Sequence, residues 1–167
     1  IALCLALSET LGKGAQTESI SENVAAANLW AFFQAKSIRL TTVKTAAEQL
    51  QVQADATTDP TVKAALMKRV ESWQKTAARY DDEPDTGEGR KQLAERAKHA
   101  EHARDLSMAK YHHFEVASAA FQIAIVLASA TIITGMIVLG WGAGLLMLAG
   151  IAFTAIGLFA PHAVHLM

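Results

Sequence analysis

The chain has 167 residues, 51% of them hydrophobic, and a formal net charge of -1. This length suits one domain, and the balanced charge excludes the basic footprint of a nucleic-acid-binding protein. The charges are unevenly placed, because all 15 Lys and Arg lie between Lys13 and Lys110 and no Asp, Glu, Lys or Arg follows Glu115.

The first segment, residues 1–11, opens with the apolar run Ile1–Leu7, which includes the single cysteine, Cys4. A secretory signal peptide would carry a basic start and a small-x-small cleavage pattern, and neither is present. We therefore expect the second half of a membrane helix whose first half lies outside this sequence. Eleven residues span about 16 Å, roughly half a bilayer. Gly12 and Gly14 then predict a hinge.

A long helix is predicted over about 16–56, where neither Pro nor Gly occurs. A first stripe follows the 4-3 spacing of a coiled-coil seam and consists of Leu29, Phe33, Lys36, Leu40, Val43, Ala47 and Leu50. A second stripe beside it consists of Val24, Ala27, Ala31, Ala35 and Ile38. Two adjacent stripes predict more than one packing neighbour.

Two further helices complete a helical extramembrane domain, residues 12–115. Asp59 suits the N-cap and Pro60 the first turn of a helix over 60–80. Residues 81–89 form a polar loop, since they contain Pro84 and two glycines. A third helix is predicted over 90–115, and no breaker separates it from the apolar residues that follow. The domain is expected to consist of long antiparallel helices.

Residues 116–160 predict a transmembrane hairpin, because about 20 apolar residues suffice to span a bilayer. The spans are expected at 116–134 and up to 160, joined by a turn at 135–142, with a C-terminal tail at 161–167. Together with the first segment this gives an all-α membrane protein with three transmembrane helices. The sequence shows no strand signal and no internal repeat.

The stretch "NLWAFFQAKSIR" places aromatic residues beside basic ones. Trp30 lies 19 residues past Leu11, about 28 Å along a continuous helix, which is too far for a membrane-interface aromatic belt. We expect a packed helical hairpin here, with Ala97 and Ala100 receiving the aromatic rings. A surface helix kinked at Gly12 or Gly14 is the alternative. The motif residues are Trp30, Phe32, Phe33, Gln34, Lys36 and Arg39.

Lys36 interrupts the first stripe with a charge, so it needs a partner or a route to water. Glu95 or Glu101 on the returning helix could supply the partner. A partly exposed stem is the equal alternative.

The membrane interface is expected at Tyr111, His112 and Phe114, just before the charge-free region. His112 and His113 could sense pH there, but plain interfacial residues are the favoured interpretation. His162 and His165 are likewise expected to be a polar C-terminal cap.

Two weak ligand patterns occur, each outweighed by a structural interpretation. Glu95, His99 and His102 share one helix face and could bind a metal such as Zn²⁺, although a solvated helix face explains them better. Gly87, Gly89, Arg90 and Lys91 precede a helix and could bind an anion, although a capped turn with Thr86 is simpler.

Within the apolar region, Gln122 is expected to face protein, because polar groups in membranes hydrogen-bond to protein. Small residues at Ala120, Ala124 and Ala128 and at several glycines of the last span allow close helix contact. Self-association into a homo-oligomer is therefore expected. No catalytic constellation is present, so neither an enzyme nor a cofactor is predicted.

"NLWAFFQAKSIR", "EPDTGEGRKQL" and "FQIAIVLASATIITG", in that order, resemble a bacterial family of membrane proteins known only as a domain of unknown function (family 4337). The resemblance implies one membrane helix, a helical extramembrane region and a membrane hairpin, and no activity. We expect a homo-oligomeric structural or scaffolding protein of the bacterial inner membrane, in contact with lipid and with copies of itself or an unidentified protein. A channel or transporter subunit with a path along the oligomer axis is the alternative, and a metal-binding protein is third.

The side on which the extramembrane domain lies is indicated by two opposed signals. The positive-inside rule places its basic residues in the cytoplasm, but the domain is too long for that rule. The resemblance implies a basic N-terminal segment in the cytoplasm and hence a periplasmic domain, which we favour.

Overall fold

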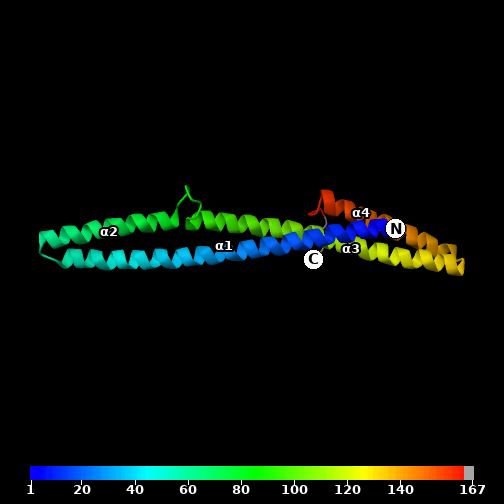
Figure 1. Cartoon of the computed structure of the whole chain (residues 1–167), viewed down its shortest axis with the longest axis horizontal. Helices are drawn as coiled ribbons and strands as arrows, with labels where there is room; N and C mark the ends of the chain where they lie inside the picture. The colour runs from blue at the N-terminus through cyan, green and yellow to red at the C-terminus, as the bar shows by residue number, and fades with distance from the viewer. Residues whose placement is uncertain (164–167) are drawn as a thin grey trace. The chain divides into compact units, whose positions relative to one another are not determined.

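The structure is a computed structural model that describes residues 1–163. These residues form four helices and no strand: α1 (Ala2–Ala56), α2 (Pro60–Asp81), α3 (Arg90–Thr134) and α4 (Ile137–Phe159) (Figure 1). The predicted all-α class is confirmed. The chain divides into two compact units, unit 1 with Ile1–Asn23 and the residues from Glu101 onward, and unit 2 with Val24–Ala100.

The predicted hinge at Gly12 and Gly14 is wrong, because both glycines lie within the unbroken 55-residue helix α1. A glycine inside a helix costs only about 1 kcal/mol relative to Ala, and no proline is present to break the helix. Gly12 is buried, and a Cβ at this position would lie 3.4 Å from Cβ of Phe114. It therefore allows close packing rather than bending.

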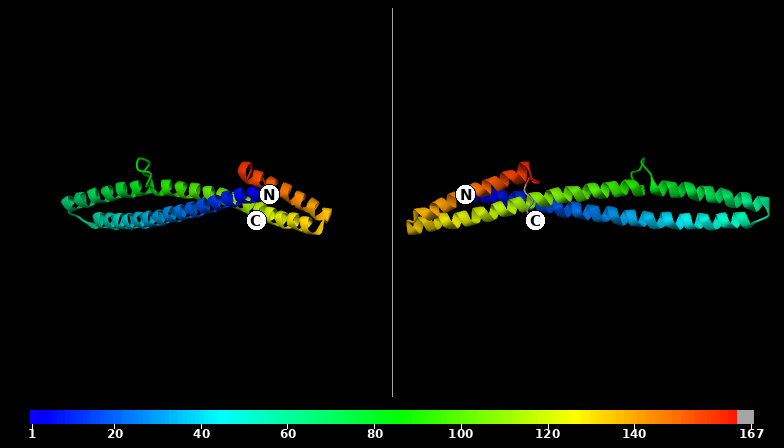
Figure 2. Two further views of the ribbon diagram at one scale, coloured as in Figure 1. Left: turned by 45° about the vertical axis from the view of Figure 1, so that its right-hand side comes forward. Right: turned by 180° about the vertical axis from the view of Figure 1, so that it is seen from behind.

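The predicted turn at 135–142 is too long, because α4 already begins at Ile137. Gly135 has a φ of 69°, a conformation that residues with a side chain rarely adopt, and it makes the reversal. Gly140 and Gly142 lie inside α4 instead. Helices α3 and α4 consequently fold back on each other as a close hairpin (Figures 1 and 2).

Unit 2 is built around a second hairpin, in which α2 runs back alongside the C-terminal part of α1 (Figures 1 and 2). Asp59 caps α2 as predicted, since its Oδ1 accepts hydrogen bonds from the backbone N–H of Thr61 at 2.8 Å and of Val62 at 3.2 Å. Every residue of the first stripe of α1 is buried or half-buried. The fully buried apolar side chains of this unit are Ala26, Leu40, Ala47, Ala54, Val70, Ala77, Leu93, Ala97 and Ala100.

The second stripe of α1 does not pack within the chain. Val24 is 53% exposed and Ile38 is 68% exposed, and the alanines between them are exposed as well. The expected second neighbour is therefore not found among residues 1–163.

Unit 1 packs the N-terminal part of α1 and helix α4 against the C-terminal part of α3. The buried stripe of α1 continues here with the same spacing but with small residues, Ser8, Gly12, Ala15 and Ser19. Helix α4 presents Ala143, Gly150 and Gly157 as its buried residues. A Cβ at Gly150 would lie 2.6 Å from the ring of Phe121, so the predicted close helix contacts are made within the chain.

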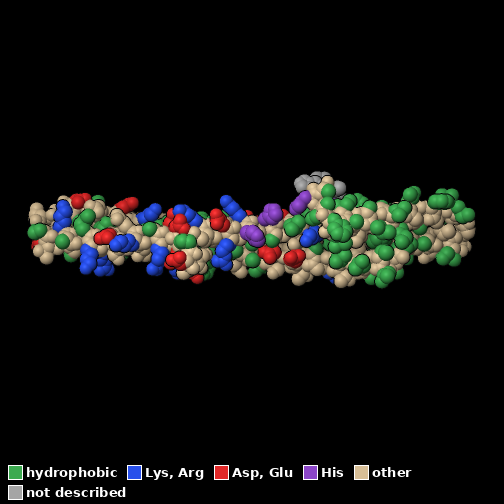
Figure 3. Space-filling model, turned by 90° about the horizontal axis from the view of Figure 1, so that it is seen from above, with side chains coloured by type: hydrophobic (Ala, Val, Ile, Leu, Met, Phe, Trp, Pro, Cys, Tyr) green, Lys and Arg blue, Asp and Glu red, His purple; other side chains and the backbone are tan. Residues whose placement is uncertain are grey.

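Two helices, α3 and α4, are long and apolar enough to cross a membrane by length and composition. Only 28% of the apolar window of α3 and 17% of that of α4 is buried. Large apolar side chains of unit 1 are therefore exposed, as Figure 3 shows for the C-terminal part of α3 and for α4. Those more than 70% exposed are Leu3, Ile132, Ile133, Ile137, Val138, Trp141 and Phe159.

Candidate functional sites in the two units

Lys36 is buried at the loop between α2 and α3, with only 8% of its surface exposed. Its Nζ lies 3.6 Å from Oε2 of Glu83 and 5.3 Å from the centroid of the Tyr80 ring. Oε1 of the same carboxylate lies 3.2 Å from Nε of Arg79. The predicted partners, Glu95 or Glu101, were wrong, and so was the alternative of an exposed stem. The partner comes instead from the polar loop, residues 81–89, to which the sequence pattern gave no role in pairing.

The loop is tied to the start of α3 by charge-assisted contacts. Arg90 lies 2.8 Å from Oδ1 of Asp81 through Nη2, and Lys91 lies 3.0 Å from Oδ2 of Asp82 through Nζ. Gln92 donates from Nε2 to Oδ1 of Asp82 at 2.6 Å and accepts from the backbone N–H of Glu83 at 3.2 Å. The end of α2 and the first turn of α3 are thus held together.

These contacts shift two pKa values. The hydrogen bond from Gln92, and after it that from Lys91, lowers the pKa of Asp82 below its ordinary 3.8. The hydrogen bond to Asp82 and the negative charge of its carboxylate raise the pKa of Lys91 above its ordinary 10.5. Both shifts favour the charged forms.

The candidate anion site at Gly87, Gly89, Arg90 and Lys91 is a closed turn. Both cations already face aspartates of the chain. Gly87 has a φ of 67°, and a Cβ at Gly89 would clash with Oε1 of Gln92 and the backbone of Glu83. Oγ1 of Thr86 accepts from the N–H of Glu88 at 3.3 Å. The four residues therefore shape a capped loop, the simpler interpretation, instead of an open anion cradle.

The aromatic motif divides between an inner and an outer face of α1. The rings of Trp30 and Phe33 meet edge to face, with centroids 5.4 Å apart, and the guanidinium of Arg90 lies 5.6 Å from the Phe33 centroid. Gln34 and Arg39 are exposed, as is Phe32 at 57%. The inner residues thus connect the first motif with the start of α3.

The metal candidate is not assembled. Glu95, His99 and His102 are all exposed. Within residues 1–163 no group of three or more His, Cys, Asp or Glu is arranged to hold a metal ion. A solvated helix face is the better description.

Unit 1 contains a groove of about 390 Å³, which we call the polar groove. Its walls come from α1 and α3: Ser8, Glu9, Gly12, Lys13, Gln16, Tyr111, Phe114, Glu115, Ser118, Ala119 and Gln122. Gln122, predicted to face protein, donates from Nε2 to Oε1 of Glu9 at 3.3 Å. Ser8 donates to the backbone oxygen of Phe114 at 3.0 Å.

Two of these residues, Ser8 and Glu9, were missed by sequence reasoning. The prediction of a membrane segment rested on the apolar run Ile1–Leu7 and gave no role to Glu9, a carboxylate in the same segment. Extending the 4-3 spacing of the α1 seam toward the N-terminus would have reached Ser8. The neighbouring Glu9 would then have been considered against the returning helix.

The predicted interface residues differ in exposure. Tyr111 and His112 are half-buried, and both lie near Glu115: Tyr111 Oη is 3.5 Å from Oε1, and His112 Nδ1 is 3.7 Å from Oε2. Phe114 is only 3% exposed, so it packs inside unit 1, and its place at the membrane interface stays a prediction. Its ring lies against Gly157 of α4, where an added Cβ would be 3.0 Å away.

The neighbouring His113 is buried, with 1% of its surface exposed. Its Nε2 lies 3.0 Å from the backbone oxygen of Pro161, while its Nδ1 has no hydrogen-bond partner. A carbonyl oxygen only accepts, so Nε2 donates this hydrogen bond. His113 thus fastens the end of α4, and its location at the membrane interface stays a prediction. His162 is exposed, and His165 lies outside the described residues.

Comparison with known proteins identifies a family but no activity. No curated protein and no solved structure gave a significant match. The family model described as "Domain of unknown function (DUF4337)" matches residues 1–160, almost the whole chain. The chain therefore belongs to this family of unknown function.

Proposed function

We propose that this protein is a homo-oligomeric membrane scaffold, in which unit 1 is embedded in a lipid bilayer and unit 2 presents an association surface outside it. The observation that carries the membrane part is the exposure of apolar side chains on α3 and α4. Burying these side chains in lipid removes them from water, which no contact among residues 1–163 achieves.

Hydroxyl groups in this apolar region are compatible with the same environment, and Thr41, Thr42 and Thr76 of unit 2 make the same kind of bond. Thr131, Thr134 and Thr154 each donate to the backbone oxygen four residues earlier, at 2.7 to 2.8 Å. Such bonds satisfy hydroxyl donors without water.

We propose further that the N-terminal part of α1 forms a third membrane segment. It lies along α3 in unit 1, as the bond from Ser8 to Phe114 shows. Leu3 is 84% exposed and Leu7 is 56% exposed, so this face is also apolar. Three segments, a bacterial inner-membrane location and a periplasmic unit 2 would place the C-terminus in the periplasm. Alkaline phosphatase fused at the C-terminus should be active, and an inactive fusion would refute this orientation.

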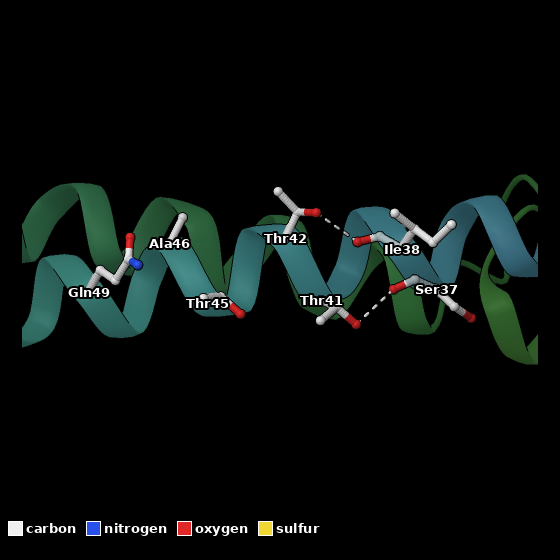
Figure 4. Close-up of a pocket in the computed structure, with 7 residues that line it drawn as sticks. All are labelled: Ser37, Ile38, Thr41, Thr42, Thr45, Ala46 and Gln49. Carbon is white, nitrogen blue, oxygen red and sulfur yellow. Dashed lines mark hydrogen bonds between the residues drawn. The ribbon is translucent and has the colours of Figure 1, made fainter.

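The association surface is an exposed heptad row on α1, here called the outer seam: Val24, Asn28, Ala31, Ala35, Ile38, Thr42, Thr45, Gln49 and Val52. All nine residues are exposed and none is charged. Figure 4 shows part of it, where Ile38, Thr42 and Thr45 line a shallow pocket of about 640 Å³ formed by α1 alone.

A second copy of the chain is the partner that suits this seam. Two copies inserted in the membrane with the same topology are related by a two-fold axis along the membrane normal. Each residue near this axis then faces the same residue of the other copy. Charged residues would repel each other there, whereas the uncharged outer seam can face itself at 4-3 spacing. The heptad spacing predicted for the buried first stripe of α1 thus also applies to the exposed outer seam.

The test is disulfide crosslinking in membranes, in a Cys4→Ser background. Ile38→Cys should crosslink to its copy, whereas Val62→Cys, also on an exposed apolar residue but on α2, should not. In mild detergent, Ile38→Glu should lower the oligomer mass while Val62→Glu leaves it unchanged. A monomeric parent protein, or equal behaviour of the two positions, would refute the scaffold.

A channel or transporter subunit is the second candidate, because Glu9 and Gln122 place a polar pair among apolar helices. It requires ion flux through proteoliposomes that Glu9→Gln reduces. Flux equal to that of empty liposomes would exclude it.

A further inference from the structure

The polar groove combines opposite charges at the point where the charged part of α3 ends. Glu115 is the last acidic residue of the sequence, and α3 continues without charge from Val116. Glu9 and Glu115 contribute two carboxylates to the groove, and Lys13 contributes one ammonium. If unit 1 is embedded as proposed above, this boundary lies at the level of the lipid headgroups.

At the level of the lipid headgroups, the negative charge of Glu9 is incompletely neutralised by its neighbours. Its described hydrogen-bond partner is the neutral amide of Gln122, at 3.3 Å. A carboxylate that leaves bulk water is stabilised most by a cation that also donates hydrogen bonds. The groove therefore favours a cationic donor beside Glu9.

We propose that the polar groove binds the headgroup of a phospholipid that carries a primary amine. Its ammonium lies toward Glu9 and Glu115, and its phosphate lies toward Lys13. A primary ammonium donates three hydrogen bonds, as a lysine side chain does, whereas a quaternary ammonium donates none. The volume of about 390 Å³ falls within the range of small-molecule pockets, about 300–1,000 Å³.

Charge also excludes the purely anionic headgroups as the preferred ligand. The lining holds two acidic side chains and one basic side chain, and so repels a net negative headgroup. A zwitterionic amine headgroup matches both signs. The order of preference is phosphatidylethanolamine, then phosphatidylcholine and phosphatidylglycerol.

The test uses the full chain in mild detergent and measures bound lipid by native mass spectrometry against equal amounts of the three lipids. Phosphatidylethanolamine should be retained about fivefold more than phosphatidylcholine, the ratio expected for the net contribution of one hydrogen bond, about 1 kcal/mol. Glu9→Gln keeps the shape and a hydrogen-bonding oxygen, and should abolish this preference. Glu18→Gln, exposed on α1 outside the groove, should leave it unchanged. Equal retention of the three lipids, or an unchanged preference in Glu9→Gln, would overturn the proposal.

Two further experiments are needed. The first distinguishes a lipid headgroup from a soluble ligand, and the second tests membrane insertion separately from headgroup binding. Soluble phosphoethanolamine should not compete at concentrations where the lipid binds, and full competition would assign the groove to a soluble ligand. Flotation with phosphatidylcholine liposomes tests insertion alone. Flotation without a headgroup preference overturns only the groove proposal, and failure to float overturns the membrane function as well.

Discussion

The packing of α4 on α3 can be tested at a single glycine. A Cβ at Gly150 would lie 2.6, 2.8 and 2.9 Å from three ring carbons of Phe121, whereas a Cβ at Gly144 would meet nothing within 4 Å. Phe121 is only 1% exposed, so its ring has no free space into which to turn. Gly150→Ala must therefore displace the ring or separate the two helices.

The expected magnitude follows from comparing two substitutions of the same kind. Gly→Ala inside a helix gains about 1 kcal/mol in helix propensity, and this gain is common to both sites. Overpacking at Gly150 costs about 1–3 kcal/mol, which Gly144→Ala avoids. Gly150→Ala should therefore be less stable than Gly144→Ala by about 1–3 kcal/mol. Gly157, where the shortest contact would be 3.0 Å, should fall between them.

The assay is unfolding of the purified chain in mild detergent, followed by helical circular dichroism. Phe121→Leu provides a second control, because removing the ring should reduce the penalty of Gly150→Ala in a double-mutant cycle. Equal stability of Gly150→Ala and Gly144→Ala, or a penalty independent of Phe121, would refute the close approach of α3 and α4.

Four further substitutions test unit 2 by thermal unfolding. Lys36→Met should change stability by less than about 1 kcal/mol, since its stem stays packed, whereas Glu83→Ala should cost about 1–3 kcal/mol because it leaves the buried ammonium unpaired. Asp59→Ala should cost about 0.5–2 kcal/mol through loss of the α2 cap. The pKa of Asp82 is lowered, chiefly by Gln92, so its contribution is present above pH 3.8 and is lost as pH falls below that value. The difference in Tm between the parent protein and Asp82→Asn should therefore shrink below pH 3.8, and a constant difference would contradict this assignment.

The local sequence pattern predicted the helices and the buried stripe of α1 well, because both depend on residues within about one helical turn of each other. The spacing from Leu29 to Leu50 identified the buried side of α1, and Asp59 with Pro60 located the start of α2. The helical extent near Gly12 was mispredicted, since a glycine weakens a helix on average but also permits the close contact with Phe114 seen here.

The partner of Lys36 depended on the path of the loop and could not be read from spacing. The expected partners, Glu95 and Glu101, lie on α3, the helix that returns alongside α1. Glu83, two residues past the end of α2, instead lies beside Lys36. The position at which α2 ends thus determines that Glu83, and not Glu95 or Glu101, forms the ion pair with Lys36.

The seam of α1 differs between the two units in a way that fits the membrane location proposed for unit 1. In unit 2 it buries large side chains such as Leu40, 4% exposed, and Leu→Ala in a core costs about 2–5 kcal/mol. In unit 1 it contains Ser8, whose hydroxyl bonds the backbone oxygen of Phe114, and such bonds in membrane proteins contribute about 0.6 kcal/mol on average. Lipid is as apolar as leucine, so helices in it gain from close approach and not from large apolar side chains. Leu40→Ala should therefore destabilise the chain several times more than Ser8→Ala in detergent unfolding, and equal losses would mean that unit 1 gains its stability from exclusion of water.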